Sequence, residues 1–387
     1  MAGKCRGESE SSTSERILDG IEVSALGFGC MRFPILDGDP AKIDEAATIK
    51  MVRHAIDNGV NYVDTAWPYH REQGEAMVGK ALRDGYREKV YLATKSPVFY
   101  VKEPADFDKY LNRQLEKLET DHIDFYLLHA LTKKRWQECL GNEVFNFIRR
   151  AKADGRIRYI GFSFHDALPH FKEIVDGYPW DFCQIQFNYM NEKYQAGLEG
   201  LHYAAGKGLP VVIMEPLLGG RLAKPGPEAL QKIWASGHQK RSPVDWALRW
   251  LWNNPEVTVV LSGMSAMEQV VENLSIVEDA LPNSMDEAEL AVIERARQFY
   301  LAQTKVGCTE CNYCQDCPAK VQIPRIFSLY NEAFMYGEHE EAKKVYKRLE
   351  EKEGSFSACL DCGQCEEVCP QHLEIRKHLG EFQRIYS

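Results

Sequence analysis

The sequence predicts an α/β chain, in which a (β/α)8 TIM barrel is followed by a smaller, mainly α-helical C-terminal domain. Three observations support this prediction. Short apolar runs alternate with amphipathic runs over about 265 residues, which is the size and rhythm of such a barrel. No GxGxxG occurs in the chain, so the alternative of an open, doubly wound sheet lacks its usual fingerprint. Eight of the twelve cysteines lie in the last eighty residues.

The predicted elements follow in chain order. Asp19-Gly20 between apolar residues predicts a hairpin that precedes the barrel. The barrel strands are predicted at Ala25–Gly29, Tyr62–Asp64, Val90–Lys95, Ile123–His129, Ile157–Ser163, Phe182–Phe187, Pro210–Glu215 and Val257–Gly263. The helices are predicted at Ile43–Asn58, Gly74–Asp84, Asp106–Leu118, Asn142–Ala153, Ala167–Asp176, Gly197–Lys207, Pro243–Trp252 and Ala266–Asp279.

Composition gives the domain limits and excludes some partners. Residues 1–15 are rich in Ser and Glu and have no apolar core, which predicts a disordered tail rather than a secretory signal. The barrel is expected at 16–285, a connecting helix at 286–305 and the second domain at 306–387. Helices at Ile323–Tyr336 and Glu338–Glu351 are expected to separate and cover its metal centres. A net charge of −10 without a long basic run argues against nucleic acid, and no apolar stretch is long enough for a membrane.

The cysteines of the C-terminal domain form two quartets. The first runs Cys308, Cys311, Cys314, Cys317-Pro318, and the second runs Cys359, Cys362, Cys365, Cys369-Pro370. Three thiolates spaced by two residues wrap one iron–sulfur cube, and the fourth ligand then comes from the other run. We therefore expect two [4Fe–4S] clusters with crosswise ligands: Cys308, Cys311, Cys314 and Cys369 for one, and Cys359, Cys362, Cys365 and Cys317 for the other.

Two other uses of these cysteines fit less well. Zinc would take four ligands and leave the third cysteine of each triplet and the Cys-Pro pairs unexplained. Disulfides would need an oxidising compartment, and nothing in the sequence indicates secretion. Cysteines kept as cluster ligands indicate a reducing interior, so we expect a cytoplasmic protein.

Polar residues at or just beyond three predicted strand ends are candidates for catalysis, because all strands of such a barrel open onto one face. These residues are Asp64, Tyr69, Lys95 and His129. Each has a plain explanation when taken alone, since a histidine that ends an apolar strand is more often hydrogen-bonded structure than a catalyst. Together, at the ends of the second, third and fourth strands, they predict an active site.

With these residues the sequence resembles the aldo-keto reductase family. The segment from Asp64 to Tyr69 matches the family's DTAxxY, while Lys95 and His129 match the other two members of its catalytic tetrad. The resemblance implies that Tyr69 is the general acid for carbonyl reduction. Lys95 would lower the pKa of the Tyr69 phenol, and Asp64 would hold Lys95 in place. His129 would donate a hydrogen bond that orients the substrate oxygen.

The resemblance also implies a nicotinamide cofactor, NADP(H) in preference to NAD(H). Ser163 and Gln184 match the positions that bind the nicotinamide amide, and Met214 stands where many members stack an aromatic ring. The loop from Pro216 to Arg221 resembles the one that closes over the pyrophosphate. Gly263 and Gln269 replace the lysine and arginine that many members place on the 2′-phosphate. The full cofactor set is Gly29, Cys30, Met31, Ser163, Gln184, Met214, Pro216, Leu217, Gly219, Arg221, Gly263, Ser265, Gln269, Glu272 and Asn273.

A narrower resemblance covers nearly the whole chain. A subset of aldo-keto reductases is fused to a C-terminal ferredoxin-like domain, and both cysteine quartets are similar to theirs, including the short last spacing before Cys317. The implied function is an oxidoreductase that interconverts a small carbonyl substrate and its alcohol. Its two clusters would exchange electrons with a ferredoxin or flavodoxin-type partner. An added flavin would bridge two-electron and one-electron steps, and no sequence feature requires one.

Two alternatives stay open. The barrel of a redox-sensing or electron-transfer protein would bind nicotinamide without significant turnover, or the clusters would serve structure alone. The substrate is not specified by the sequence. The loops 131–140 and 222–242 are expected to shape specificity. An aromatic mouth and simple packing are equally good explanations for the five aromatic residues near strand ends, Trp67, Phe99, Tyr100, Trp136 and Phe164.

Overall fold

The computed structural model describes residues 15–18, 20–308, 313–352, 354–369 and 371–387. These residues fall into two compact units. One unit runs up to Ala223 and continues at Arg241–Glu287, and the other combines Lys224–Lys240 with Ala288–Ser387. Residues 1–14 of the predicted tail, Cys311 and Pro370 lie outside the described residues, whereas Glu15, the last residue of that predicted tail, lies in a strand. No described helix combines the length and the apolar character needed to cross a membrane.

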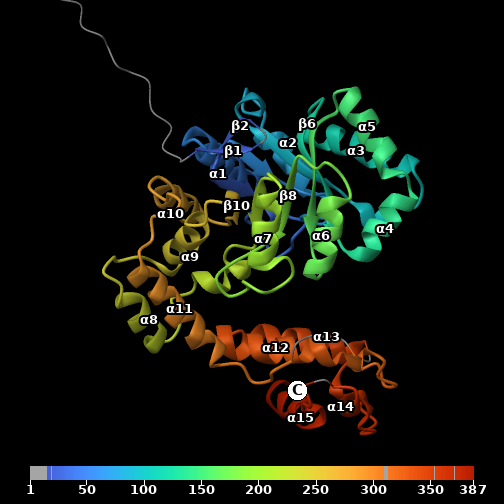
Figure 1. The fold of residues 1–387 in the computed structure, drawn as a ribbon, viewed down its shortest axis with the longest axis vertical. Helices are drawn as coiled ribbons and strands as arrows, with labels where there is room; N and C mark the ends of the chain where they lie inside the picture. Colours follow the sequence, from blue (N-terminus) through green and yellow to red (C-terminus); the bar gives the residue numbers. More distant parts are fainter. Residues whose placement is uncertain (1–14, 19, 309–312, 353, 370) are drawn as a thin grey trace, which may run out of the picture. The chain divides into compact units, whose positions relative to one another are not determined.

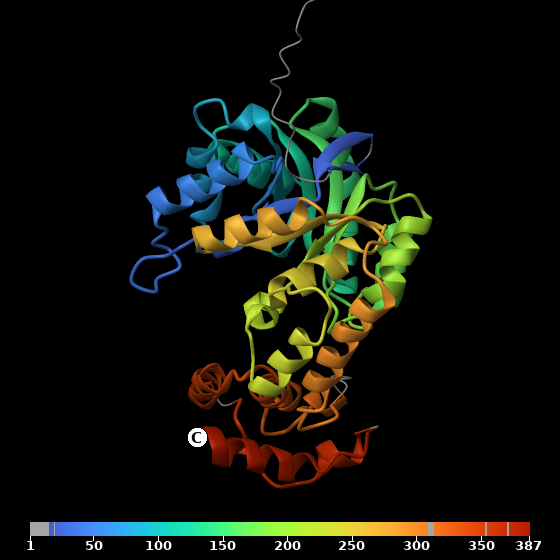
Figure 2. The same cartoon turned by 90° about the vertical axis from the view of Figure 1, so that its left-hand side faces the viewer.

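The first unit is a closed barrel of eight strands with helices around it (Figures 1 and 2). Every neighbouring pair of these strands is parallel, in the order β10-β3-β4-β5-β6-β7-β8-β9. Their bounds are β3 Leu26–Gly29, β4 Tyr62–Asp64, β5 Tyr91–Ser96, β6 Ile123–Leu131, β7 Ile157–Phe164, β8 Phe182–Gln186, β9 Val211–Met214 and β10 Val257–Gly263. The predicted fold class is thereby confirmed.

Helices follow the strands along the chain, as the alternation of the sequence predicts. They are α1 Glu45–Asp57, α2 Gly74–Ala81, α3 Ala105–Leu118, α4 Lys133–Gly141, α5 Val144–Ala153, α6 Leu168–Asp176, α7 Gly197–Gly206, α9 Pro243–Trp252 and α10 Met267–Val277. The helix α4 corrects the prediction of a loop at 131–140. It begins where the Thr132 side chain accepts the backbone N–H of Arg135, and it buries Trp136 and Cys139 one turn apart.

The predicted hairpin is confirmed. The strand β1 (Glu15–Leu18) pairs antiparallel with β2 (Ile21–Ser24), and Gly20 between them has φ 81°. Glycine adopts this left-handed backbone without a steric penalty. Val23 of β2 packs into the barrel interior with Tyr62, Phe125 and other inward-facing side chains. The hairpin therefore covers the end of the barrel at which the strands begin.

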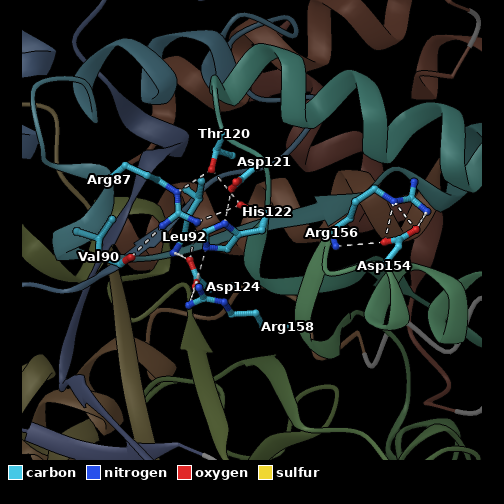
Figure 3. A network of polar contacts seen from close by, with 10 residues as sticks. All are labelled: Arg87, Val90, Leu92, Thr120, Asp121, His122, Asp124, Asp154, Arg156 and Arg158. Carbon is cyan, nitrogen blue, oxygen red and sulfur yellow. Dashed lines mark hydrogen bonds and ion pairs between the residues drawn. The ribbon is translucent and has the colours of Figure 1, made fainter.

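A polar network ties the strands together at that same end (Figure 3). Asp124, at the start of β6, is 1% exposed and accepts hydrogen bonds from Arg87 at 2.8 Å and from Arg158 at 2.7 Å. It also accepts the backbone N–H of Leu92 in β5 at 2.9 Å. These partners compensate a buried carboxylate. A hollow of about 1290 Å³ adjoins this network, and Arg87 and Arg158 in its lining are both paired with Asp124, so we assign it to structure.

The second unit is helical. Its elements are α8 Glu228–Ala235, α11 Glu287–Leu301, α12 Ile323–Tyr336, α13 His339–Glu351, α14 Gln364–Glu367 and α15 Ile375–Tyr386. The loop predicted at 222–242 contains α8, which joins this unit through a hydrogen bond from Arg295 to Ser236 and an ion pair of Lys224 with Glu338. A core that includes Phe327, Tyr346 and Phe382 joins α12, α13 and α15.

Candidate functional site

The four candidate catalytic residues meet at the end of the barrel where the strands finish. Asp64 ends β4, Lys95 lies in β5 and His129 lies in β6, while Tyr69 stands in the loop after β4. Lys95 Nζ donates to Asp64 Oδ1 at 2.6 Å and to the Thr65 carbonyl at 2.7 Å. Lys95 is also hydrogen-bonded to the Tyr69 side chain. Because Lys95 and Asp64 are buried, the ammonium has a fixed position next to the phenol.

The surroundings of Tyr69 and Lys95 hold both side chains in place. The carbonyl of Tyr69 accepts the N–H of Gly74 at 3.1 Å, and a Cβ at position 74 would lie only 3.0 Å from the Cβ of Tyr69. A side chain at position 74 would therefore push against Tyr69, and glycine at the start of α2 lets the two segments pack closely. Behind β5, the buried Gln114 donates to the Lys95 carbonyl at 3.0 Å and to Glu75 at 2.5 Å. This buried network fixes the strand that carries Lys95.

The electrostatics of Tyr69 correct one expectation. Burial raises the pKa of the Tyr69 phenol and outweighs the Lys95 ammonium, which lowers it, so the net pKa lies above the usual value of 10.0. The sequence indicates the ammonium but not the desolvation of the phenol by the residues that pack around it. Burial lowers the pKa of Lys95, but Asp64 and Tyr69 more than reverse this effect and keep the amine charged.

His129 completes the group as a neutral imidazole. Burial, followed by the charges of Lys95 and its other cationic neighbours, lowers the pKa of His129 well below 6.5. The His129 ring lies 6.4 Å from the Tyr69 ring, centre to centre, at an interplanar angle of 83°. Its Nδ1 is buried and has no hydrogen-bond partner among the described residues. A neutral ring with unused hydrogen-bonding capacity is suited to orienting a substrate oxygen.

A cavity of about 470 Å³ opens over these four side chains. All four line it. So do most of the residues expected to bind the cofactor: Gly29, Met31, Ser163, Gln184, Met214, Pro216, Leu217, Gly219, Gly263, Ser265, Gln269, Glu272 and Asn273. Cys30 and Arg221 are not among the lining residues. The Cys30 thiol is fully buried in the barrel core, 3.8 Å from the Phe28 carbonyl.

The inner part of the cavity fits a nicotinamide ring. Gln184 Nε2 lies 3.4 Å from the Met214 sulfur, while Gln184 Oε1 is buried and has no partner among the described residues. An unpaired buried acceptor is costly, and the NH₂ of a carboxamide would satisfy it. The Ser163 hydroxyl accepts the Ala130 N–H at 2.7 Å, which leaves its proton available to a carboxamide oxygen. Met214 offers a thioether face for the ring.

The outer part of the cavity is lined by loops. The 3-10 segment Leu218–Ala223 has Gly219 at φ 70° and Gly220 at φ 92°, so both need glycine. Beyond β10, Gln269 accepts the Ser265 N–H at 2.8 Å, Asn273 donates to Ser262 at 2.7 Å, and Glu272 accepts the Ser242 hydroxyl at 2.7 Å. These side chains give a polar surface suited to an adenosine group.

Three charged or titratable residues that the sequence analysis did not single out also line the cavity: Arg32, His165 and Glu215. The stem of Arg32 passes 3.2 Å from the Cβ position of Gly263, and its Nη2 lies 3.0 Å from that of Gly219. Arg32 therefore brings a cation to loops in which Gly263 and Gln269 supply none. No sequence signal pointed to Arg32. It follows β3, the first barrel strand in the chain, whereas Gly263 ends β10, the last one.

Of the two explanations left open for the five aromatic residues near strand ends, an aromatic mouth is not supported, since none of them lines this cavity. Trp136 and Phe164 belong to the barrel core, where Trp136 packs against Trp180 and Phe164 packs against Phe171. For these two residues packing is the correct explanation. Phe99 comes nearest to the site, with its ring 5.7 Å from that of His129.

The cysteines of the helical unit gather around two cavities. One, of about 210 Å³, is lined by Cys317 of the first quartet and by three members of the second, Cys359, Cys362 and Cys365, with Cys314 also at its wall. The other is lined by Cys308, Cys314 and Cys369, and Cys311 lies outside the described residues. Each cavity thus brings together thiols from both quartets, as crosswise ligation requires. The residues present fit two iron–sulfur clusters.

Comparison with known proteins agrees with this geometry. The profile of the aldo/keto reductase family matches residues 25–290, and that of the 4Fe-4S dicluster domain matches residues 307–373. The L-galactose dehydrogenase of Arabidopsis thaliana is 29% identical over 71% of this chain and 91% of its own length. The NADH-specific methylglyoxal reductase of Escherichia coli is 25% identical over 66% and 90%.

Solved structures show the same fold. The holo form of the aldo-keto reductase AKR11C1 from Bacillus halodurans is 26% identical, with a TM-score of 0.61 over 73% of this chain and 96% of that one. An aldo/keto reductase from Klebsiella pneumoniae, solved with NADP and acetate, has a TM-score of 0.59 at 24% identity over 72% and 92%. The chain therefore belongs to the aldo/keto reductase family of oxidoreductases and carries a 4Fe-4S dicluster domain after its barrel.

Proposed function

We propose that this chain interconverts a small aldehyde or ketone and its alcohol with a nicotinamide cofactor, and that Tyr69 is its general acid and base. One observation carries the proposal. Lys95 is hydrogen-bonded to both Asp64 and Tyr69 at the wall of a cavity that His129 also lines. A protonated phenol, a fixed ammonium and a neutral imidazole around one space are the groups that carbonyl reduction needs.

The cofactor would lie along the cavity, and when bound it supplies the hydride. Gln184 Oε1 and the Ser163 hydroxyl would hold its carboxamide, and Met214 would pack on the ring. Gly29 and Met31 would contact it beside β3. Pro216, Leu217 and Gly219 would hold the phosphates. Ser265, Gln269, Glu272 and Asn273 would line the adenosine end. We propose NADP(H) as the preferred form, because Arg32 offers a cation beside Gly263.

The protein's own residues then handle the proton. His129, neutral at physiological pH, donates a hydrogen bond that orients the substrate oxygen. Tyr69 gives its hydroxyl proton to that oxygen as negative charge develops there, and the Lys95 ammonium stabilises the phenolate left behind. Asp64 keeps Lys95 charged and in place. The reverse sequence serves alcohol oxidation.

The dicluster domain would add one-electron chemistry. Cys308, Cys311, Cys314 and Cys369 would hold one cluster. Cys317, Cys359, Cys362 and Cys365 would hold the other. We propose that these clusters exchange electrons with a ferredoxin or flavodoxin-type partner.

The proposal is tested with full-length protein purified anaerobically. Iron and sulfide are counted, and NADPH and NADH oxidation is followed with a carbonyl panel that includes methylglyoxal, together with the oxidation of L-galactose. Turnover that the Tyr69→Phe variant loses, while it still binds the cofactor, supports the proposal. Equal inactivity of both proteins across the panel, with the cofactor bound, would favour a sensor in place of an enzyme.

A further inference from the structure

Arg376 borders one of the two cysteine-lined cavities. It stands in the first turn of α15 and lines the cavity of Cys317, Cys359, Cys362 and Cys365. Its guanidinium carbon is 3.7 Å from the position that a Cβ on Gly363 would take. Gly363 lies between two of those cysteines and has φ 76°, so the guanidinium packs directly over the loop that carries the thiols.

Two carboxylates fix the position of this guanidinium. Nη2 donates to Glu366 Oε2 at 2.8 Å, and Nη1 donates to Asp361 Oδ1 at 2.9 Å. The backbone N–H of Arg376 also donates to Glu366, to Oε1 at 2.9 Å. Glu366 and Asp361 both belong to the segment between Cys359 and Cys369. The side chain is therefore tied to the loop that it covers.

The third guanidinium nitrogen, Nε, takes no part in these ion pairs. Nε of Arg376 is buried and has no hydrogen-bond partner among the residues that the structure describes. A buried donor that is left unsatisfied destabilises the protein, and the cost is larger when the group is charged. Salt bridges hold the guanidinium in place while its buried Nε–H has no acceptor among the described residues, which points to an acceptor that is not an amino acid.

We propose that Arg376 Nε–H donates a hydrogen bond to a sulfur of the cluster held by Cys317, Cys359, Cys362 and Cys365, and so raises the reduction potential of that cluster. The inference rests on the proposed cluster assignment. Reduction adds negative charge to the cluster sulfurs, and an N–H donor stabilises the charge. Because Glu366 and Asp361 balance the charge of the guanidinium, the directed hydrogen bond carries the effect.

The second cavity provides a contrast within the same chain. Its described lining residues comprise Cys308, Cys314, Cys369 and seven uncharged side chains, with no lysine or arginine. The two clusters are therefore expected to differ in potential, and the one beside Arg376 is expected to accept the first electron. An electron that enters the domain would then rest at the Cys317 cluster.

A redox titration of the anaerobic, full-length holoprotein, followed by electron paramagnetic resonance, tests this proposal. The Cys317→Ser variant first identifies which signal belongs to the cluster beside Arg376. We expect R376Q and R376K to lower the potential of that cluster and to leave the other unchanged. R376K keeps a charge for Glu366 and Asp361 but has no Nε–H, so it separates the hydrogen bond from the ion pairs. An exchangeable proton coupled to the reduced cluster should also be lost in R376K.

Two controls complete the design. Arg384 lies on the same helix, is exposed and lines neither cavity, so R384Q should shift neither potential. D361N removes one ion pair and one negative charge but keeps Nε–H, so it should not lower the potential. R376K protein with both clusters and unchanged potentials would overturn the proposal, as would an equal shift of both clusters. Wild-type protein without two clusters would instead overturn the cluster assignment.

Discussion

Lys95 Nζ lies 2.6 Å from Asp64 Oδ1, and both side chains are almost completely removed from water. The two residues come from neighbouring strands, β5 and β4, so the barrel itself sets their separation. A buried pair of this kind is stable only with good geometry and further hydrogen bonds, which the Thr65 carbonyl and Tyr69 provide. The barrel therefore holds a charged amine against a phenol, an arrangement that favours chemistry over simple packing.

Removal of the Tyr69 hydroxyl should abolish carbonyl reduction while cofactor binding persists. Loss of a positioned general acid costs about 10²–10⁴-fold in rate. The expected result for Tyr69→Phe is a fall of that size in kcat, with the dissociation constant for NADPH little changed, measured by stopped-flow kinetics and fluorescence titration. The matched control is Tyr203→Phe, whose hydroxyl binds Asp176 on the exterior and should leave kcat unaltered. Similar losses in the two variants would contradict the assigned role.

The pH dependence follows from the pKa shifts. Burial raises the pKa of Tyr69 above 10.0, so the phenol stays protonated and ready to donate through neutral pH. Burial lowers the pKa of His129 well below 6.5, so its imidazole stays neutral there. We expect kcat for carbonyl reduction to be flat from about pH 6 to pH 9 and alcohol oxidation to rise with pH, because oxidation needs the phenolate. An inflection of the reduction profile near pH 6.5 would show that His129 titrates instead.

The sequence predicts the barrel and the four-residue group because each depends on a local signal. Strand ends in a parallel barrel share one face, so Asp64, Lys95 and His129 had to converge. The raised pKa of Tyr69 was not predictable in this way, because desolvation depends on everything that packs around the phenol. Arg32 was missed for a similar reason. Closure of the barrel brings β3 beside β10, and the local pattern of apolar and polar residues does not indicate a contact between segments so far apart in the chain.

Crosswise ligation predicts which cysteine substitutions affect the same cluster. Cys317 lines the cavity of the second quartet, whereas Cys369 lines that of the first. Cys317→Ser and Cys362→Ser should therefore alter the same paramagnetic signal, and their combination should alter no further cluster. Cys369→Ser and Cys308→Ser should alter the other one. Iron analysis and electron paramagnetic resonance check this. If Cys317→Ser and Cys308→Ser altered the same signal, each cluster would instead be held within one quartet.

Stability at the opposite end of the barrel should depend on Asp124. Asp124→Asn leaves Arg87 and Arg158 without their shared carboxylate, and we expect a loss of about 3 kcal/mol in the free energy of unfolding of the barrel. Urea denaturation followed by tryptophan fluorescence measures it. Asp121→Asn is the control, because that side chain is 93% exposed and its pairing with His122 is worth about 0.5 kcal/mol. Equal effects of the two substitutions would remove the network's structural role.

Part of the remaining structure was hidden from the sequence for physical reasons. The helix α4 is short and mostly polar, and only Trp136 and Cys139 mark its buried side. The segment with α8 reads as a loop of the barrel, yet Ser236 and Lys224 contact the helical unit. Long-range partners of this kind decide where a weakly patterned segment packs.

Transfer of an isotope label tests the central claim most directly. NADPH carrying deuterium on the transferring face of its C4 is incubated with the full-length protein and a carbonyl that the panel has shown to be reduced. Mass spectrometry of the alcohol should find one deuterium on the former carbonyl carbon, while Tyr69→Phe forms little product. Alcohol formed without the label would contradict direct hydride transfer at the site of Tyr69 and Lys95. So would deuterium on the same carbon after a parallel incubation with unlabelled NADPH in D₂O.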